Sequence, residues 1–270
     1  MAMRRSDWIE VGGASLHWAI SGTGPATLVL VHEMGGSIES WDEVVEALGE
    51  GFQVLRYDQR GFGRSEKSTQ LSMEQMVDDL AALLEALQIK TPVFLAGAAL
   101  GAALCMAFAL RHPDLVKALV LSSPATGGMP AAAMQATQAR MELVRQGGLR
   151  AVTDIMLAVT YPAALRLDQQ RFERYRQQWL VNDPESFIAF NFLPGSFDLL
   201  PRLPELACPC LVIGCSLDAV RPAARSAELA ALIPGAVYEQ ADSGHYMPVQ
   251  TPALFAEHLR AFLGGAAFKQ

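Results

Sequence analysis

The chain has 270 residues, of which 51% are hydrophobic and 18% are charged, and its net charge is −7. This length and composition allow a large buried core in one or two domains. The acidic balance, with no basic run beyond Arg4-Arg5, argues against a nucleic acid or an anionic membrane as partner, so we expect a small-molecule substrate.

The start of the chain, its longest apolar run and its cysteines do not change this expectation. The chain starts without an apolar signal segment, and its longest apolar run, from Leu95 to Leu110, is interrupted by glycines and short for a membrane span. We therefore expect a cytoplasmic protein. The cysteines have no metal-site spacing and are expected to be reduced core thiols: Cys105, Cys208, Cys210 and Cys215.

Short apolar runs alternate with amphipathic patterns of helical period. This order predicts an α/β protein with a mostly parallel eight-stranded sheet and helices on both faces. Helices are expected after Ser37, after Ser72, which forms a capping-box pattern with Gln75, and from Thr251-Pro252. We place the strands at Trp8–Val11, Leu16–Ser21, Thr27–Val31, Gln53–Tyr57, Pro92–Ala96, Val116–Leu121, Cys210–Gly214 and Val237–Gln240.

Residues 125–200 break this alternation, because they lack strand-like runs and are rich in Met, Arg, Gln and aromatic residues. We interpret them as a helical lid inserted into a core of residues 1–124 and 201–270. The aromatic side chains either form the core of the insertion or line a pocket over the strand ends, where α/β sheets bind ligands. Most of its arginines are expected to pair with nearby acids, although one could bind a substrate carboxylate: Arg140, Arg145, Arg171, Arg174 and Arg176. The residues we place in a substrate pocket are Tyr161, Trp179, Phe190 and Tyr246.

The stretch "FLAGAALGAA" has the spacing of a G-x-S-x-G nucleophile elbow, with Ala99 at the serine position. Gly97 and Gly101 flank a strand-to-helix turn too tight for side chains at those positions, which holds residue 99 in a strained conformation. The first amide of the following helix, that of Leu100, would face an oxyanion, and the amide of Met34 is the second expected donor.

Five further segments bear on the family to which the elbow points: "TLVLVHEMGGSIESWD", "VLRYDQRGFGRSEK", "RHPDLVKALVLSSPA", "CPCLVIGCSLDAVRP" and "ADSGHYMPVQTP". Together with the elbow, and in this order, they resemble the α/β-hydrolase superfamily over nearly the whole chain. The resemblance implies that His245 is a general base and that Asp218 orients it. The remaining histidines singled out, His17, His112 and His258, are expected to be structural.

Two residues depart from the family pattern. The methyl group of Ala99 cannot attack a carbonyl, so the acyl-enzyme route is closed. Glu33 stands where the family usually has glycine, and it is either a solvated loop residue, an acid paired for example with Arg60, or a carboxylate that handles protons or water in a dry pocket. No neighbouring nucleophile is expected to replace the serine: Cys105, Ser122 or Ser123.

Three interpretations of Ala99 remain. The chain is a serine hydrolase whose nucleophile was replaced by alanine, a natural enzyme that works without a covalent intermediate, or a ligand-binding pseudoenzyme. The second departure at Glu33 favours the natural enzyme. We expect it to act on a small organic carbonyl compound (an ester, lactone, amide or diketone-like acid) without metal or other cofactor. Hydrolysis is the first choice and a lyase or cyclase reaction the alternative, and a homodimer is left open.

Overall fold

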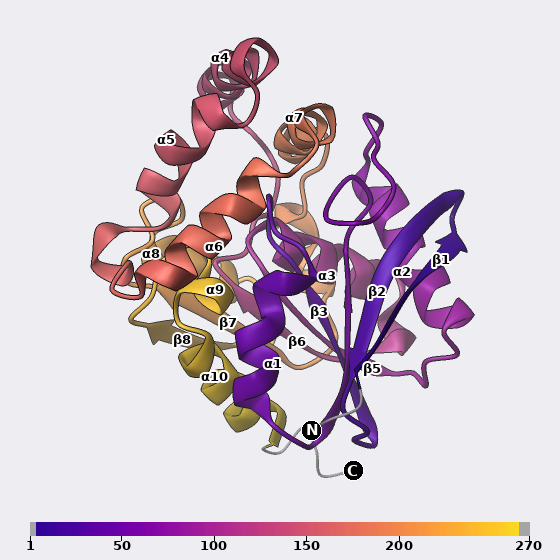
Figure 1. The fold of residues 1–270 in the computed structure, drawn as a ribbon. Coiled ribbons are helices and arrows are strands. Elements are labelled where there is room, and N and C mark those ends of the chain that lie inside the picture. Colours follow the sequence, from indigo (N-terminus) through magenta and orange to yellow (C-terminus); the bar gives the residue numbers. More distant parts are fainter. Residues whose placement is uncertain (1–3, 265–270) are drawn as a thin grey trace.

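A computed structural model describes residues 4–264, and it contains one eight-stranded sheet with helices on both faces (Figure 1). The strand order is β1-β2-β4-β3-β5-β6-β7-β8. The pairs β1/β2 and β2/β4 are antiparallel, and the remaining pairs are parallel. The predicted mostly parallel sheet is therefore confirmed. The strands are β1 (Arg4–Val11), β2 (Ala14–Ser21), β3 (Ala26–Val31), β4 (Phe52–Tyr57), β5 (Val93–Ala98), β6 (Val116–Ser122), β7 (Cys210–Cys215) and β8 (Val237–Ala241).

Two helical layers bury the two faces of the sheet. Alternate residues of β3 point to opposite sides, so Leu28 and Leu30 belong to one hydrophobic cluster and Val29 and Val31 to the other. This double burial explains why the strands read as continuous apolar runs. On the Leu28 side lie α1 (Asp42–Leu48) and α10 (Pro252–Gly264); on the Val29 side lie α2 (Met73–Ala86), α3 (Leu100–Arg111) and α8 (Ala223–Ala230).

The expected helix starts are present. The Ser72 hydroxyl accepts a hydrogen bond from the Gln75 N–H at 3.1 Å, and Pro252 is the first residue of α10. The helix expected after Ser37 begins as a 3₁₀ turn, η1, before it continues as α1. The remaining short helices are η1 (Ile38–Trp41), η2 (Pro113–Leu115), η3 (Ala163–Leu165), η4 (Leu193–Gly195), η5 (Leu200–Glu205) and α9 (Met247–Gln250).

A helical insertion lies between β6 and β7 and covers one end of the sheet in Figure 1. Its two ends are joined by a bridge between Gly127 and Asp198 and by a 2.8 Å hydrogen bond from the Leu199 N–H to the Thr126 carbonyl. The chain therefore leaves and rejoins the core at a single point. The helices of the insertion are α4 (Ala131–Gly147), α5 (Arg150–Thr160), α6 (Gln169–Leu180) and α7 (Pro184–Phe192).

The ends of the predicted core, residues 1 and 270, lie outside the described residues. Within residues 4–264, no helix has both the length and the apolar character needed to cross a membrane.

Candidate active site

The turn between β5 and α3 has the geometry of a nucleophile elbow. Ala99 has φ 51° and ψ −112°, a conformation that costs a residue other than glycine about 1–3 kcal/mol. The surrounding backbone holds it, because the Ala99 N–H donates to the Ser122 carbonyl at 2.9 Å and the Ala99 carbonyl accepts from the Ala125 N–H at 3.0 Å. The methyl group of Ala99 is 5% exposed and carries neither a lone pair nor a transferable proton.

Both flanking glycines are required by close backbone contacts. A Cβ on Gly97 would lie 2.6 Å from the carbonyl of Gly101, and one on Gly101 would lie 2.3 Å from the carbonyl oxygen of Val31. The second contact places the start of α3 directly against the loop that follows β3. Leu100 is the first residue of α3, so its N–H has no acceptor within the helix, and the positive end of the helix dipole lies at the elbow.

His245 and Asp218 are joined by a buried hydrogen bond. They follow β8 and β7, which are neighbouring parallel strands, so the two loops leave the same edge of the sheet. His245 Nδ1 lies 2.8 Å from Asp218 Oδ2, and Asp218 Oδ1 accepts from the N–H groups of Val220 and Arg221, each at 2.8 Å. Burial opposes the charge of Asp218, but the hydrogen bond and the positive charge of His245 outweigh it and lower its pKa. An ionised Asp218 therefore fixes the proton of His245 on Nδ1 and leaves Nε2 as the acceptor.

The carboxylate of Glu33 is buried in the loop after β3 and is 0% exposed, which excludes a solvated loop residue. Its Oε1 accepts hydrogen bonds from the Ser40 hydroxyl at 2.9 Å and from the Tyr175 hydroxyl at 2.7 Å. Among residues 4–264, Oε2 has no hydrogen-bond partner, and no arginine, lysine or histidine lies within 4.0 Å of the carboxylate. Gly36 leaves the room for it, because a Cβ there would lie 2.5 Å from Oε1.

The suggested pairing of Glu33 with Arg60 is wrong. Arg60 donates instead to both carboxylate oxygens of Asp79 on α2, at 2.9 and 2.6 Å, and to the carbonyl of Gly12 at 2.9 Å. The loop after β4 turns Arg60 toward α2 and the β1–β2 turn. A bidentate, almost fully buried partner outcompetes a more distant acid.

Helix α6 covers the Glu33 loop with one face. Besides the Tyr175 hydrogen bond, the ring of Trp179 fills the space over Gly35, where a Cβ would lie 2.7 Å from the ring, and Asn182 Nδ2 donates to the Gly35 carbonyl at 3.0 Å. Tyr175 and Trp179 have the i, i+4 spacing of one helix face, and Asn182 follows the end of α6. Neither Tyr175 nor Ser40 was among the candidates from the sequence. The aromatic spacing on α6 was the available signal for Tyr175.

Three of the four proposed pocket residues gather around Tyr175. Its ring centroid lies 6.1 Å from that of Tyr161, 6.3 Å from that of Trp179 and 5.9 Å from that of Tyr246. Burial raises the pKa of Tyr161 to about 12 and the pKa values of Tyr175 and Tyr246 further, so all three phenols are neutral hydrogen-bond donors. Tyr246 also lies against the His245 ring, at 4.7 Å between centroids.

Phe190 lies apart from this group. It packs on Phe62 at 4.5 Å, and Phe62 in turn contacts His32, at 5.7 Å between ring centroids. His32, which was not among the candidate site residues from the sequence, joins the loop after β3 to the loop after β4. Its Nδ1 lies 2.7 Å from the Glu33 carbonyl and its Nε2 accepts from the Gln59 N–H at 3.0 Å.

No nearby side chain replaces the missing serine. Within the described residues, neither Ser122 nor Ser123 is hydrogen-bonded to His245, and Ser122 Oγ lies 3.8 Å from Cys215 Sγ instead. Cys105 is buried inside α3, and burial raises the pKa of its thiol. The same part of the chain contains no group of three or more His, Cys, Asp or Glu side chains that could hold a metal ion.

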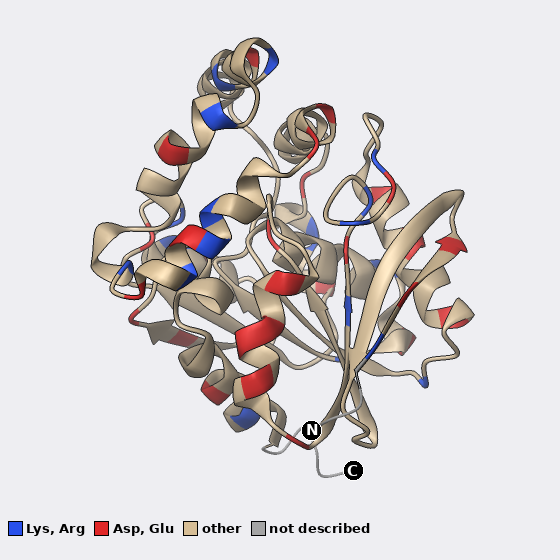
Figure 2. Ribbon diagram, viewed as in Figure 1, with Lys and Arg blue, Asp and Glu red and all other residues tan. Residues whose placement is uncertain are grey.

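The arginines of the insertion are mostly engaged by acids. The ribbon in Figure 2 shows acidic residues along α1 and basic residues on α6. Arg171 pairs with Glu43 of α1 at 2.6 Å, and Arg176 pairs with Asp154 at 2.5 Å. Of the other three arginines named from the sequence, Arg174 lies 3.7 Å from Glu43, Arg145 lies 3.4 Å from Glu142, and Arg140 donates to Thr137.

Comparison with known proteins gives the family. Residues 24–242 match the family described as serine aminopeptidase, S33. The chain belongs to this family. In sequence it is similar to the pyrrolizixenacetamide deacetylase of Xenorhabdus hominickii (28% identity, 94% of this chain and 97% of the relative). It is also similar to the putative carbamate hydrolase RutD of Agrobacterium fabrum (30% identity, 92% of this chain and 98% of the relative).

In structure the chain is similar to an enol-lactonase from Burkholderia xenovorans, with a TM-score of 0.89, 28% identity, and coverage of 96% of this chain and 100% of that one. The predicted α/β-hydrolase fold and assignment to the hydrolases are thus confirmed. This chain has Ala99 in the strained turn between β5 and α3, and a buried carboxylate, Glu33, in the loop after β3.

Proposed function

We propose that the protein hydrolyses a small organic carbonyl compound (an ester, lactone, amide or diketone-like acid) by direct attack of water. His245 Nε2 takes one proton from the water as the oxygen bonds to the carbonyl carbon. The amides of Leu100 and Met34 hold the oxyanion. When the tetrahedral intermediate collapses, the leaving group receives the proton from His245. Asp218 keeps the imidazole oriented and balances its transient charge.

The substrate class draws support from the relatives. Proteins named as an enol-lactonase, a carbamate hydrolase and a deacetylase are similar to this chain over more than nine-tenths of its length. Each of these names refers to the cleavage of a carbonyl compound. The aromatic group around Tyr175 and the helical insertion above it offer an apolar surface for such a substrate, with phenol hydroxyls as donors.

The observation that carries the proposal is the fitted environment of Glu33. Gly36, Ser40 and Tyr175 come from separate elements, and each accommodates the carboxylate. A serine hydrolase changed only at residue 99 has no use for a buried, unpaired carboxylate in its oxyanion loop. Burying such a group carries a cost of several kcal/mol. Glu33 therefore acts as a second proton-handling group in an enzyme that works without a covalent intermediate.

The test is an assay of the wild type on a panel of esters, lactones, amides and carbamates, together with His245→Ala, Glu33→Gln and Ala99→Ser. Wild type should turn over, and removal of His245 should lower kcat about 10²–10⁴-fold, which is the usual contribution of a general base. Glu33→Gln should lower kcat and leave the fold unchanged. His258→Ala on α10 is the matched control and should retain full activity.

Four outcomes contradict the proposal. Turnover by Ala99→Ser alone identifies a serine hydrolase lacking its nucleophile. Saturable binding without product identifies a binding protein. If turnover survives in His245→Ala, His245 and Asp218 have no part in the mechanism. If the detected product comes from elimination or ring closure, the reaction is that of a lyase or cyclase and not a hydrolysis.

A further inference from the structure

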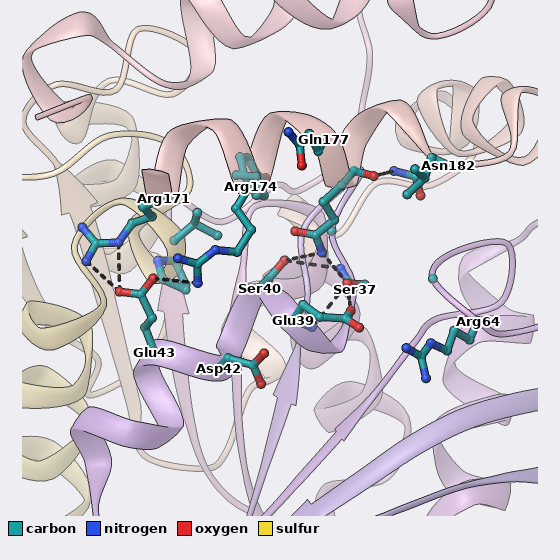
Figure 3. A pocket seen from close by; sticks show the side chains of 17 residues that line it. Ser37, Glu39, Ser40, Asp42, Glu43, Arg64, Arg171, Arg174, Gln177 and Asn182 are labelled. Carbon is teal, nitrogen blue, oxygen red and sulfur yellow. Dashed lines mark hydrogen bonds and ion pairs between the residues drawn. The ribbon is translucent and has the colours of Figure 1, made fainter. Parts of the chain in front are cut away.

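A groove of about 440 Å³ separates α6 from η1 and the start of α1 (Figure 3). Its lining residues do not include Ala99, Asp218 or His245, so it is distinct from the space over the elbow. Most of its lining residues have polar side chains, while apolar atoms supply the larger part of its surface. The side chains that face it include Ser37, Glu39, Ser40, Arg174 and Gln178.

One wall of this groove is the environment of Glu33. Gly36, Ser40 and Tyr175 all line the groove, and all three adjoin the Glu33 carboxylate. Glu33 itself is fully buried behind them. Glu33 also precedes Met34, the proposed oxyanion donor, in the chain. The carboxylate thus adjoins the proposed oxyanion loop and is separated from the groove by the Ser40 hydroxyl.

We propose that Ser40 is the proton outlet of the active site and relays a proton from Glu33 to water in the groove. This inference rests on the proposed hydrolysis, which converts the substrate into an acid that releases a proton at neutral pH. Glu33 takes up this proton at Oε2, the oxygen without a partner. A half-turn of the carboxyl group presents it to Ser40 Oγ, which passes its own hydrogen to a water in the groove. Glu33 returns to the carboxylate, and one proton has left.

Ser40 is suited to this role and Tyr175 is not. The ring of Tyr175 is enclosed by those of Tyr161, Trp179 and Tyr246, so its hydroxyl holds Glu33 in place as a fixed donor. The Ser40 oxygen accepts from the Ser37 N–H at 3.3 Å and has only a long contact of 3.5 Å with Gln178 Nε2. When this long contact opens, Ser40 Oγ has a lone pair for the Glu33 proton and can turn its own hydrogen toward the groove.

The charged groups of the groove complete the path. Glu39 accepts a hydrogen bond from Ser37 beside Ser40 and offers a carboxylate to a departing proton. The cations Arg171 and Arg174 are held by Glu43 at the other end of the groove. The neutral phenols Tyr175 and Tyr246 face Glu33 from the interior.

The experiment measures kcat and KM of wild type, Ser40→Ala and Ser40→Thr at low buffer concentration, and again with added imidazole or acetate as small proton carriers. Ser40→Ala should lower kcat roughly tenfold at low buffer, leave KM unchanged, and regain activity as the carrier is added. Its solvent deuterium isotope effect should increase. Ser40→Thr keeps the hydroxyl and should behave as wild type. Gln177→Ala, an exposed residue that lines the same groove without a hydrogen bond to Ser40 or Glu33, is the control.

A loss of kcat in Ser40→Ala that does not respond to carriers, or no loss at all, overturns the relay. If Glu33→Gln is inactive while Ser40→Ala equals wild type, the relay fails and the proposed function stands. If Glu33→Gln is fully active, or the wild type is inert on the whole panel, the proposed function itself fails and the relay fails with it.

Discussion

At the residue scale, Asp58 illustrates how one buried carboxylate fixes three segments. It accepts hydrogen bonds from the Ile38 N–H at 2.7 Å, from the Arg64 N–H at 2.8 Å and from His17 Nδ1 at 2.8 Å. The His17–Asp58 distance equals that of His245–Asp218, yet His17 Nε2 is occupied by the Ser6 hydroxyl at 3.0 Å. A histidine–aspartate pair is therefore no evidence of catalysis by itself. Within residues 4–264, His245 Nε2 has no such partner, and this free ring nitrogen distinguishes the second pair.

This role makes stability depend on pH. Burial opposes ionisation of Asp58, but the hydrogen bond from His17 and the backbone donors lower its pKa below the usual value. A lowered folded-state pKa stabilises the protein above the unfolded value of about 3.9, and this contribution is lost as the pH falls through the folded value. Asp58→Asn should cost roughly 3 kcal/mol at pH 7, and its deficit relative to wild type should shrink below about pH 4.

Urea unfolding at pH 7, 5 and 3 measures this difference. Asp114→Asn, on the exposed turn η2, is the matched control and should change the free energy of unfolding by no more than about 0.5 kcal/mol at pH 7. If Asp58→Asn lowers the free energy of unfolding by the same amount at all three pH values, the charge of Asp58 contributes nothing to stability.

Some contacts of the candidate site could be predicted from the sequence and others could not. The glycines of the elbow and the segments with His245 and Asp218 carry local patterns, because a tight turn and a strand end constrain nearby residues. The donor to Glu33, Tyr175, is 142 residues away, and no local pattern specifies such a contact. Arg60 was misassigned for the same reason, since its charge indicates an acid partner without indicating which one.

At the scale of elements, the sequence predicts every strand closely except the start of β1. All strands from β3 to β7 start and end within two residues of their predicted positions. Strand β1 begins at Arg4 instead of Trp8, because its backbone pairs with β2 along its whole length although its side chains are mostly polar. Backbone pairing at an edge does not need the apolar alternation on which the prediction depended.

The Arg60–Asp79 pair ties the loop after β4 to α2 and to the β1–β2 turn. Side-chain exposure is 7% for Arg60 and 3% for Asp79, so removal of one partner leaves a buried charge. Asp79→Ala should lower the free energy of unfolding by about 3–5 kcal/mol. Replacement of both residues, as Arg60→Met with Asp79→Leu, should recover most of that loss. Urea unfolding checks both values, and an Asp79→Ala variant as stable as wild type would contradict the burial of the pair.

At the scale of the whole molecule, the insertion and the sheet share one core. Met141, Val144 and Trp179 of the insertion belong to the same hydrophobic cluster as α2 and α3. The sequence indicated the insertion through its composition, but it could not indicate which face packs on the sheet, since that depends on the contacts between distant segments. The shared cluster implies that the insertion and the sheet unfold together.

Trp179 reports on this cooperativity, because it is the only tryptophan between residues 42 and 264. The Trp179 signal is the part of the fluorescence change on urea unfolding that wild type shows and Trp179→Phe lacks. Its midpoint should equal the midpoint measured by far-ultraviolet circular dichroism for the whole protein. The signal of the other tryptophans, which persists in the variant, is the internal control. A Trp179 transition at lower urea would mean that the insertion opens before the sheet.

The strained turn at Ala99 has an evolutionary consequence. Ala99 keeps the conformation with positive φ although its methyl group has no chemical use for it. The amide of Leu100 and the start of α3 stay at the elbow. Alanine and serine codons differ by a single base in the genetic code. A lineage with this backbone is therefore one point mutation from a residue that could attack a substrate covalently, and the preserved turn keeps both chemistries within reach of the same scaffold.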